Sequence, residues 1–475
     1  MSAEASRWYG PDRAEPDQTI ATHLARIQYE DLPKEACESA VHSIMDSFGT
    51  VLAGSSAPIV RQLVDMVQDW GGRAQASVLV TGARVPAPHA ALANAAMARG
   101  QFMDDMEEKI GDHPTVAPLY AALAAAELKG GCSGKDLITA VTLASDLLLR
   151  VRYALHTEAR EFAWCTESFT CLSASIAAGK ILGFDADAFL DAIGVAFMQL
   201  SSTWLMHQEG AGIHELQHGF GTRNGVIATL LARNGVSGPR HVIEGEYGMV
   251  HALNASNYDR GVLLDGLGER YRTVDITLKR FPMAGFACYA IEGTRDLMRN
   301  HALSASAVRG ATVRVNKRAY LRACQPEDIK RRPPTLGHAR FSIPYAVAAT
   351  IVRGDFFLDE LSPSSLNDPS ILDMAQRVQC VVDPDIDKLG AVVVPLIVEL
   401  YLTSGQSLQL RVDNPRGHPL NPMTISEIAE KSRRCAQYAE PALDAKAVDE
   451  AIELLSRLDR VQNITEVVAR LVAAQ

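Results

Sequence analysis

The sequence predicts a mainly α protein, with a large all-α helical domain and a smaller α+β domain. The 475-residue chain is 47% hydrophobic but only 6% aromatic, and such a composition favours packed helices over β-sandwiches. Helix-period segments fill the first half of the chain, whereas alternating apolar and polar residues, typical of half-buried strands, follow Lys279. The length indicates two or three domains.

The N-terminal part predicts a short arm followed by helices. Residues 1–16 are polar and charged, which indicates a mobile arm and not a signal peptide. Asp17 is placed to cap the first helix, and the second follows Pro33 and ends near Gly54. A short strand is predicted at 77–82. Further helices, separated by Gly, Pro or Asp, are predicted at 88–100, 115–130, 135–152, 170–182, 185–198 and 218–234.

After Lys279 the pattern changes to strands mixed with helices. Strands are predicted at 308–317, 378–382, 392–403 and 407–412, with a hairpin turn at Ser404-Gly405. Two helices are predicted at 343–352 and 369–376, and amphipathic helices return from Thr424. The predicted domains are therefore a helical domain of residues 17–278 and 413–475 and an α+β lid of residues 279–412.

Composition and charge exclude several classes of partner. The net charge of -10 argues against nucleic acid, because phosphate neutralisation needs a basic face. An anionic small molecule stays compatible, since a pocket can be locally positive on an acidic protein. No apolar run is long enough to cross a membrane, and there is no P-loop, dinucleotide fingerprint or zinc-ligand spacing. We expect a cytoplasmic protein with no metal, nucleic-acid or membrane partner.

Five collinear segments resemble the MmgE/PrpD family of 2-methylcitrate dehydratases, cis-aconitate decarboxylases and iminodisuccinate epimerases. In chain order they read YEDLPKEACESAVHSIMDSFGTVLAG, FMDDMEEKIGDHPTVAPLYAALAAAE, LQHGFGTRNGVIATLLARNGVSGP, RFSIPYAVAATIVRGDF and VDNPRGHPLNPM. The resemblance implies a homodimer, an active-site cleft between the helical and lid domains, and no metal or organic cofactor. It also implies chemistry at a proton or carboxylate next to a carboxyl group, which needs cationic donors and a tuned acid/base group.

The resemblance points to four catalytic candidates. Asp104 and Asp105 match paired aspartates of the family, although helix capping or pairing with Lys109 is the structural alternative. His113 matches a histidine of the catalytic region, and a histidine side chain can serve as an acid, a base or a carboxylate donor. His214 stands where the family usually has lysine. We predict that the two histidines form an acid/base pair, which the aspartates orient.

Further positions are predicted to bind the substrate. Lys279 opens the lid segment and is the candidate for binding a carboxylate, and Lys109 is a further cationic candidate. Gln217 and His218 match a polar pair at a helix start, and Tyr345 matches a lid tyrosine. The structural alternatives are a histidine that packs at the helix start and a buried tyrosine.

Two other candidates depart from the family pattern. Trp164 and Cys288 stand where the family has histidines, just as His214 replaces a lysine. Each lost charge-assisted hydrogen bond is worth ~1.5–3 kcal/mol, so the native substrate is expected to be less anionic than methylcitrate. Cys288 remains a candidate thiol base if a cation lies beside it.

These observations predict a cofactor-independent lyase or isomerase that abstracts a proton next to a carboxyl or carbonyl group of a small carboxylate. Dehydration is the first choice and epimerisation the second. The alternatives are a cis-aconitate-type decarboxylase and a degenerate family member that binds a metabolite without turnover.

Overall fold

The computed structural model describes residues 15–155, 164–209, 211–253, 255, 257–390 and 393–473. Residues 1–14 of the predicted arm lie outside the described residues, and Pro16 already belongs to the first helix. The chain divides into two compact units. Unit 1 comprises Met1–Gly100, Asp112–Ile276 and Thr424–Gln475, and unit 2 comprises Gln101–Gly111 and Thr277–Met423. The segment Gln101–Gly111, which the sequence analysis placed in the helical domain, thus belongs to unit 2.

The predicted fold class, a mainly α protein with a smaller α+β domain, is confirmed. Unit 1 contains helices α1 (Pro16–Arg26), α2 (Lys34–Gly54), α3 (Pro58–Trp70), α4 (Ala87–Gly100), α5 (Val116–Lys129), α6 (Gly134–Ala154), α7 (Thr170–Leu182), α8 (Ala186–Phe197), α9 (Leu205–Glu209), α10 (Gln217–Arg233), α11 (Met249–Ala252), α12 (Arg260–Leu264), α21 (Ile425–Ala436), α22 (Ala445–Ser456) and α23 (Thr465–Val468). It also contains a small hairpin of β1 (Ala76–Ser77) and β2 (Arg84–Val85).

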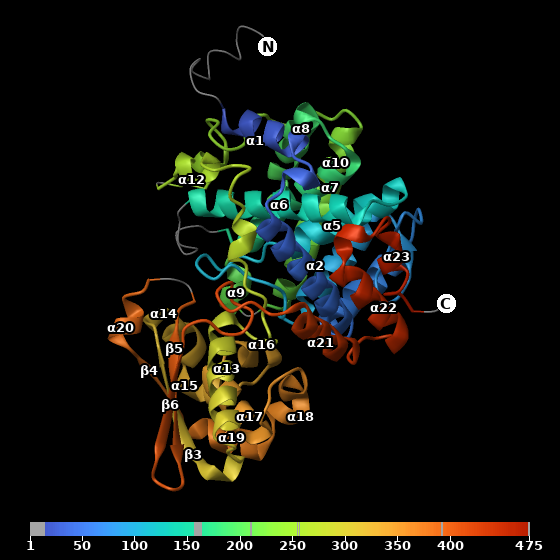
Figure 1. Ribbon diagram of the computed structural model, residues 1–475. Helices are drawn as coiled ribbons and strands as arrows, with labels where there is room; N and C mark the ends of the chain where they lie inside the picture. Colours follow the sequence, from blue (N-terminus) through green and yellow to red (C-terminus); the bar gives the residue numbers. More distant parts are fainter. Residues whose placement is uncertain are drawn as a thin grey trace. The chain divides into compact units, whose positions relative to one another are not determined.

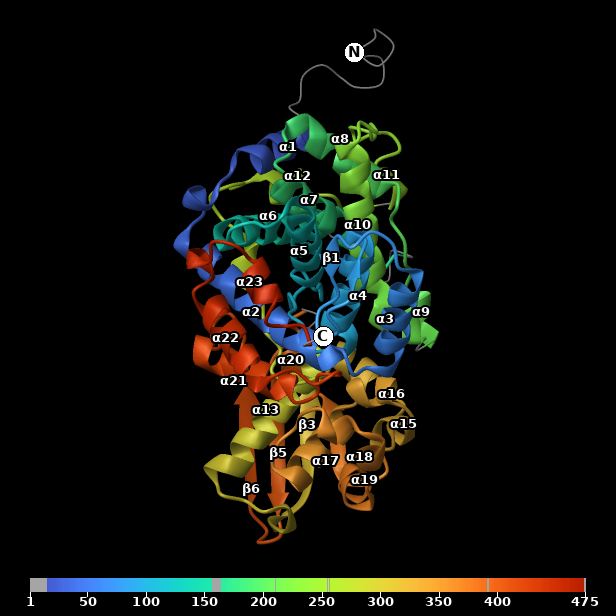
Figure 2. The same cartoon turned by 90° about the vertical axis from the view of Figure 1, so that its right-hand side faces the viewer.

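The helices α4, α5, α7 and α10 pack together in unit 1 (Figure 2). Glycines permit the close approach of α10 to its neighbours. A Cβ atom on Gly221 would lie 1.8 Å from Thr170 Oγ1 of α7, and one on Gly219 would lie 2.6 Å from the carbonyl oxygen of Leu92 of α4. The glycines of the QHGFGTRNG segment are therefore required by packing, and they fix the start of α10.

The C-terminal helices pack against the N-terminal part of unit 1. Helices α21 and α22, red in Figure 1, lie beside α2, which is blue. Lys431 of α21 donates to Asp46 Oδ1 of α2 at 2.7 Å, and both side chains are buried. The predicted return to helices after Thr424 is explained by this packing, because the apolar faces of these helices need a partner.

Unit 2 is built on a four-stranded sheet with the order β4-β3-β5-β6. The strands are β3 (Val308–Val315), β4 (Val378–Val382), β5 (Leu396–Leu402) and β6 (Ser407–Val412). Strand β3 runs parallel to β4 and antiparallel to β5, and β5 and β6 form an antiparallel hairpin. Gly405 lies in the hairpin turn with a φ of 91°, as the Ser404-Gly405 pair predicted.

Helices pack against this sheet to form the core of unit 2 (Figure 1). Those that contact the strands are α13 (Gly285–Asn300), α17 (Ile343–Arg353) and α19 (Pro369–Gln376). Unit 2 also contains the short helices α14 (Lys317–Ala319), α15 (Glu327–Arg331), α16 (Leu336–Arg340), α18 (Pro363–Leu366) and α20 (Pro384–Asp387). A Cβ atom on Gly293 would lie 2.8 Å from Val412 Cγ2, so glycine lets α13 pack closely on β6. Within the described ranges, no helix is long and apolar enough to cross a membrane.

Candidate active site

The predicted site residues divide between the two units. Unit 1 holds His113, Trp164, His214, Gln217 and His218. Unit 2 holds Asp104, Asp105, Lys109, Lys279, Cys288 and Tyr345. That the two aspartates orient the histidines stays a prediction.

His214 lies in a buried cluster with two charged side chains. It belongs to a 3₁₀ turn, η4 (Gly212–Leu216), directly before α10. His214 Nε2 lies 3.4 Å from Glu167 Oε1 and 3.4 Å from Arg99 Nη2. Arg99 and Glu167 are 2% and 3% exposed, and Arg99 Nη2 lies 3.9 Å from Glu167 Oε1. A carboxylate against one ring nitrogen fixes the orientation of an imidazole, which an acid/base histidine requires.

His113 contacts Asp112 through its backbone and His218 through its ring. Its backbone N–H donates to Asp112 Oδ1 at 2.8 Å, and Arg152 Nε lies 3.0 Å from Asp112 Oδ2. Burial raises the pKa of Asp112, and the Arg152 guanidinium opposes that shift. The His113 ring lies 5.7 Å from the ring of His218, edge to face at 85°. Helix α5 begins at Val116, so His113 lies just before this helix.

The remaining unit 1 candidates lie near the starts of helical segments. Trp164 forms an isolated antiparallel bridge with Thr203, and it precedes the 3₁₀ turn η3 (Thr166–Phe169), which carries Glu167. Gln217 is the first residue of α10 and is partly exposed.

Lys279 and Asp104 form a buried pair in unit 2. Lys279 Nζ lies 3.6 Å from Asp104 Oδ1 and donates to the carbonyl oxygen of Phe102 at 2.6 Å. The Phe102 ring has two cations over it, because Lys279 Nζ lies 5.2 Å and Arg340 Cζ 5.3 Å from its centroid. Phe102 has a φ of 61°, a strained backbone conformation that is common at functional sites. This arrangement brings two cationic side chains to one aromatic ring, and one of them lies beside the Asp104 carboxylate.

Lys109 and Tyr345 have less support from the geometry. Lys109 is exposed, and the cation observed beside Asp104 is Lys279, not Lys109 as the structural alternative suggested. Tyr345 is fully buried, and its hydroxyl donates to the carbonyl oxygen of Glu360 at 2.5 Å. The structural alternative, a buried tyrosine, therefore describes Tyr345 better than a ligand contact does. Asp105 is 3% exposed, next to Asp104.

A small cavity of about 10 Å³ in unit 2 is lined by Lys279, Cys288, Glu108 and Tyr289 among others. The Tyr289 hydroxyl donates to Glu108 Oε2 at 2.5 Å. Burial raises the pKa of Glu108 to about 7, although the Tyr289 hydrogen bond opposes the shift. The Cys288 Sγ contacts carbonyl oxygens, those of Phe281 at 3.7 Å and Met283 at 3.6 Å, so these contacts supply no cation to the thiol.

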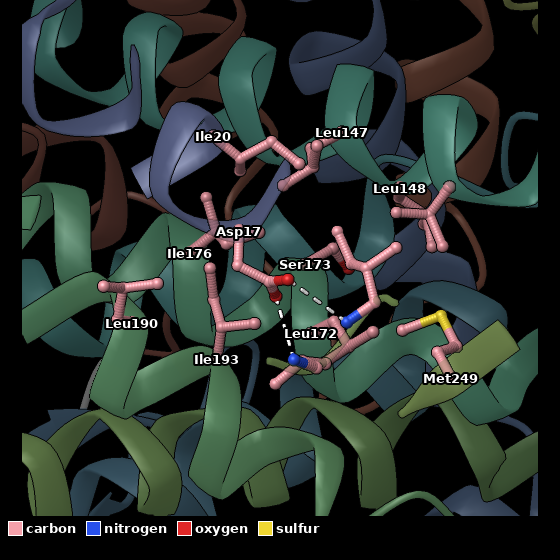
Figure 3. A pocket seen from close by; sticks show the side chains of 13 residues that line it. Asp17, Ile20, Leu147, Leu148, Leu172, Ser173, Ile176, Leu190, Ile193 and Met249 are labelled. Carbon is pink, nitrogen blue, oxygen red and sulfur yellow. Dashed lines mark hydrogen bonds between the residues drawn. The ribbon is translucent and has the colours of Figure 1, made fainter. Parts of the chain in front are cut away.

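A second cavity, of about 30 Å³, lies inside unit 1 and has apolar walls (Figure 3). Its polar lining includes Asp17, whose carboxylate accepts from the backbone N–H groups of Val242 at 3.0 Å and Ile243 at 3.4 Å. The prediction that Asp17 caps the first helix is therefore wrong, because this carboxylate binds a distant loop. Burial raises the pKa of Asp17 to about 7. No predicted site residue lines this cavity, so it gives no support to the predicted site.

Four polar residues of these clusters were not predicted from the sequence: Arg99, Glu167, Glu108 and Tyr289. Arg99 had a weak signal, since it is the one charged side chain in the small-residue helix α4, and a charge in such a helix is usually buried and paired. Glu108 lay inside the DDMEEK segment but was not distinguished from its neighbours. In the part of the chain that the structure describes, no three His, Cys, Asp or Glu side chains are grouped to hold a metal ion.

A helical domain with a buried histidine–carboxylate cluster and an α+β domain with a buried lysine–aspartate pair define a two-domain protein with acid/base side chains in both parts. The family model described as the MmgE/PrpD N-terminal domain matches residues 18–260, and the MmgE/PrpD C-terminal domain matches residues 281–460. The chain belongs to the MmgE/PrpD family, which confirms the resemblance.

Three curated relatives match over nearly the whole chain. A cis-aconitate decarboxylase-like protein, oryM, of Aspergillus oryzae is 25% identical over 470 residues, 95% of this chain and 96% of that protein. A cis-aconitate decarboxylase of Aspergillus terreus strain NIH 2624 is 25% identical over 466 residues, 94% of each chain. A further cis-aconitate decarboxylase of Aspergillus terreus is 24% identical over the same length.

Proposed function

We propose that this protein is a lyase of the dehydratase/decarboxylase type, which acts on a small carboxylate without a cofactor. The observation that carries the proposal is the buried contact of His214 with Glu167 in a chain that matches the family over both domains. Reactions of this type move a proton at a carbon next to a carboxyl group, and an oriented imidazole can accept or donate it. His113 is proposed as the second acid/base residue.

The proposed substrate carries fewer carboxylates than methylcitrate. Lys279 supplies a buried ammonium that suits one carboxylate, but Asp104 already balances part of its charge. At two positions where the resemblance implies histidine, the chain has Trp164 and Cys288, neither of which supplies a fixed positive charge. A dicarboxylate or a partly apolar hydroxy acid matches this small number of positive charges better than a tricarboxylate does. The functional protein is proposed to be a homodimer, as the family resemblance implies.

Dehydration is the first candidate reaction, and decarboxylation is the second. Decarboxylation is favoured by a specific observation, because the three curated relatives are named for cis-aconitate decarboxylation. Both reactions share a proton transfer at carbon, so they use the same acid/base groups but differ in the bond that breaks. The products, water or carbon dioxide, distinguish them.

The test is turnover of a panel of hydroxy-dicarboxylates, hydroxy-tricarboxylates and cis-aconitate, followed by proton NMR in deuterated water together with carbon dioxide release. We expect an unsaturated product or α-deuterated substrate with one member of the panel. The variant His113→Ala should lower kcat about 10²–10⁴-fold, the usual contribution of an acid/base residue. His89→Ala is a matched control, since His89 also lies in unit 1, is partly buried and packs on Trp70.

Binding without chemistry would contradict the proposal. If calorimetry shows that a carboxylate binds, but no deuterium enters it and no product forms, the protein is a binding member of the family. Equal turnover by His113→Ala and the wild type would show that His113 takes no part in the mechanism. The products formed would then decide by themselves whether the protein is a lyase.

A further inference from the structure

The small cavity of unit 2 contains a carboxyl group that the family comparison does not explain. Glu108 lies in the segment Gln101–Gly111, and Tyr289 lies on α13, yet the Tyr289 hydroxyl contacts Glu108 Oε2 at 2.5 Å. Glu108 is 8% exposed, and the cavity of about 10 Å³ that it lines also reaches Lys279. A volume of that order holds about one water molecule.

We propose that Glu108, oriented by Tyr289, is an acid/base residue that protonates the leaving group of a carboxylate substrate held by Lys279. The inference rests on the proposed lyase function, because it supplies a protonation that the reaction requires. In a dehydration, the C–O bond breaks with its electron pair on oxygen, and that oxygen takes the proton of Glu108 and leaves as water. The proton of the broken C–H bond goes to a base, the role that the proposed function gives to histidine. The electron pair of that bond forms the C=C bond, and Glu108 becomes a carboxylate.

The size of the cavity and the hydrogen bond beside it agree with this role. The departing group is a hydroxyl that becomes one water molecule, and the cavity is of that size. The Tyr289 hydroxyl donates to the carboxylate that forms, so the product state of Glu108 is stabilised by a hydrogen bond already in place. Lys279, which pairs with Asp104, lines the same cavity, so an ammonium for a carboxylate and an acid for a leaving hydroxyl lie at one cavity.

The surroundings of Glu108 favour its neutral form. Charged or titratable side chains that line the cavity or face Glu108 are Glu107, Lys279, Arg280, Cys288, Tyr289, Glu292, Arg416 and His418. Burial raises the pKa of Glu108 to about 7, and the charge of Glu107 raises it further. His418 Nε2 lies 3.9 Å from Glu108 Oε2, but burial lowers the pKa of His418, so at neutral pH it adds little positive charge. A substantial share of Glu108 is therefore a carboxylic acid at neutral pH.

The experiment compares pH profiles of kcat/KM for the wild type, Glu108→Gln and Tyr289→Phe with the substrate found in the panel. The wild type should lose activity above about pH 7, because Glu108 must be protonated to act as the acid. Glu108→Gln should lower kcat about 10²–10⁴-fold and abolish this alkaline limb, with a small effect on KM. Tyr289→Phe removes a donor to the carboxylate, which raises the pKa of Glu108, so the limb should move to higher pH.

The control is Glu292→Gln, which also alters a buried carboxyl group beside the cavity. The Glu292 carboxylate accepts a hydrogen bond from Arg280 at 3.1 Å. This variant should keep the alkaline limb where the wild type has it. Difference infrared spectroscopy should show the carboxylic acid C=O bands of Glu108 and Asp17 ionising near neutral pH in the wild type, and Glu108→Gln should lose one of these two bands. An unchanged limb in Glu108→Gln would overturn the inference but not the lyase function, whereas no turnover of any substrate by the wild type would overturn both.

Discussion

Glu167 Oε1 lies 3.4 Å from His214 Nε2 in a cluster that also contains the buried guanidinium of Arg99. The three residues come from η3, η4 and α4. A buried charge is costly unless it is paired, so the cluster has a structural role as well as a chemical one. The carboxylate fixes the imidazole of His214, and the guanidinium balances the carboxylate.

The variant Glu167→Gln tests whether this contact serves catalysis. Glutamine keeps the size of the side chain but removes the charge that holds the His214 ring. We expect kcat to fall by at least about tenfold, with a smaller change in KM. A tenfold change has the same free energy as a shift of one unit in a pKa. Glu209→Gln is the control, since Glu209 is an exposed glutamate of the same unit. A kcat equal to that of the wild type would show that the contact is structural only.

The variant Lys279→Met tests the buried ammonium of unit 2. Loss of a charge-assisted bond of ~1.5–3 kcal/mol should raise KM for the carboxylate roughly ten- to hundredfold. It should also lower the free energy of unfolding, by about 3 kcal/mol or more, because the variant breaks a buried ion pair by removing one partner. Urea denaturation and steady-state kinetics measure the two effects.

The double variant Asp104→Asn/Lys279→Met separates binding from stability. Removing both charges should restore part of the free energy of unfolding but leave KM high. If KM returned to the wild-type value together with stability, Lys279 would have no direct part in carboxylate binding.

Asp17 predicts a pH dependence of stability. Burial raises its pKa in the folded protein to about 7 from an ordinary value of 3.8. Between these two values the folded state holds a proton that the unfolded state has lost, so the free energy of unfolding falls as the pH rises from about 4 to 7. Above pH 7 both states are ionised, and the contribution of Asp17 stays constant.

Asp17→Asn should flatten this part of the pH profile. The amide cannot ionise, and its one oxygen replaces only one of the two acceptors for Val242 and Ile243. We expect the variant to be less stable than the wild type by about 1 kcal/mol at pH 5, the worth of one hydrogen bond, with a smaller difference at pH 8. Thermal or urea denaturation across pH 5 to 8 measures this, and parallel profiles would contradict the assignment.

Elements with strong local patterns could be predicted from the sequence. The predicted bounds of α7 (170–182), α19 (369–376) and β4 (378–382) agree with the structure, because glycine, proline and β-branched residues mark their ends or interiors. The strand predicted at 77–82 was mostly wrong. Val80 has a φ of 65°, and the chain reverses there into β2 after only two strand residues.

The candidate site residues themselves could be predicted from the sequence, but the residues that contact them could not. His113, His214 and Lys279 were predicted from motifs, and the structure buries His214 and Lys279 against carboxylates. Their partners could not be predicted, because no local pattern connects them. Tyr289 is 181 residues from Glu108, and His214 is 115 residues from Arg99.

The sequence by itself determined the helical periodicity, the change to strands after Lys279 and the membership of the MmgE/PrpD family. Only the tertiary structure decided which charges are buried and which side chains face them. The physical reason is that periodicity and turn chemistry are properties of neighbouring residues, whereas desolvation and ion pairing depend on groups that meet only when distant segments pack together. Glu108 shows the difference, since as a residue of the DDMEEK segment it has an ordinary carboxyl group, and burial raises its pKa to about 7.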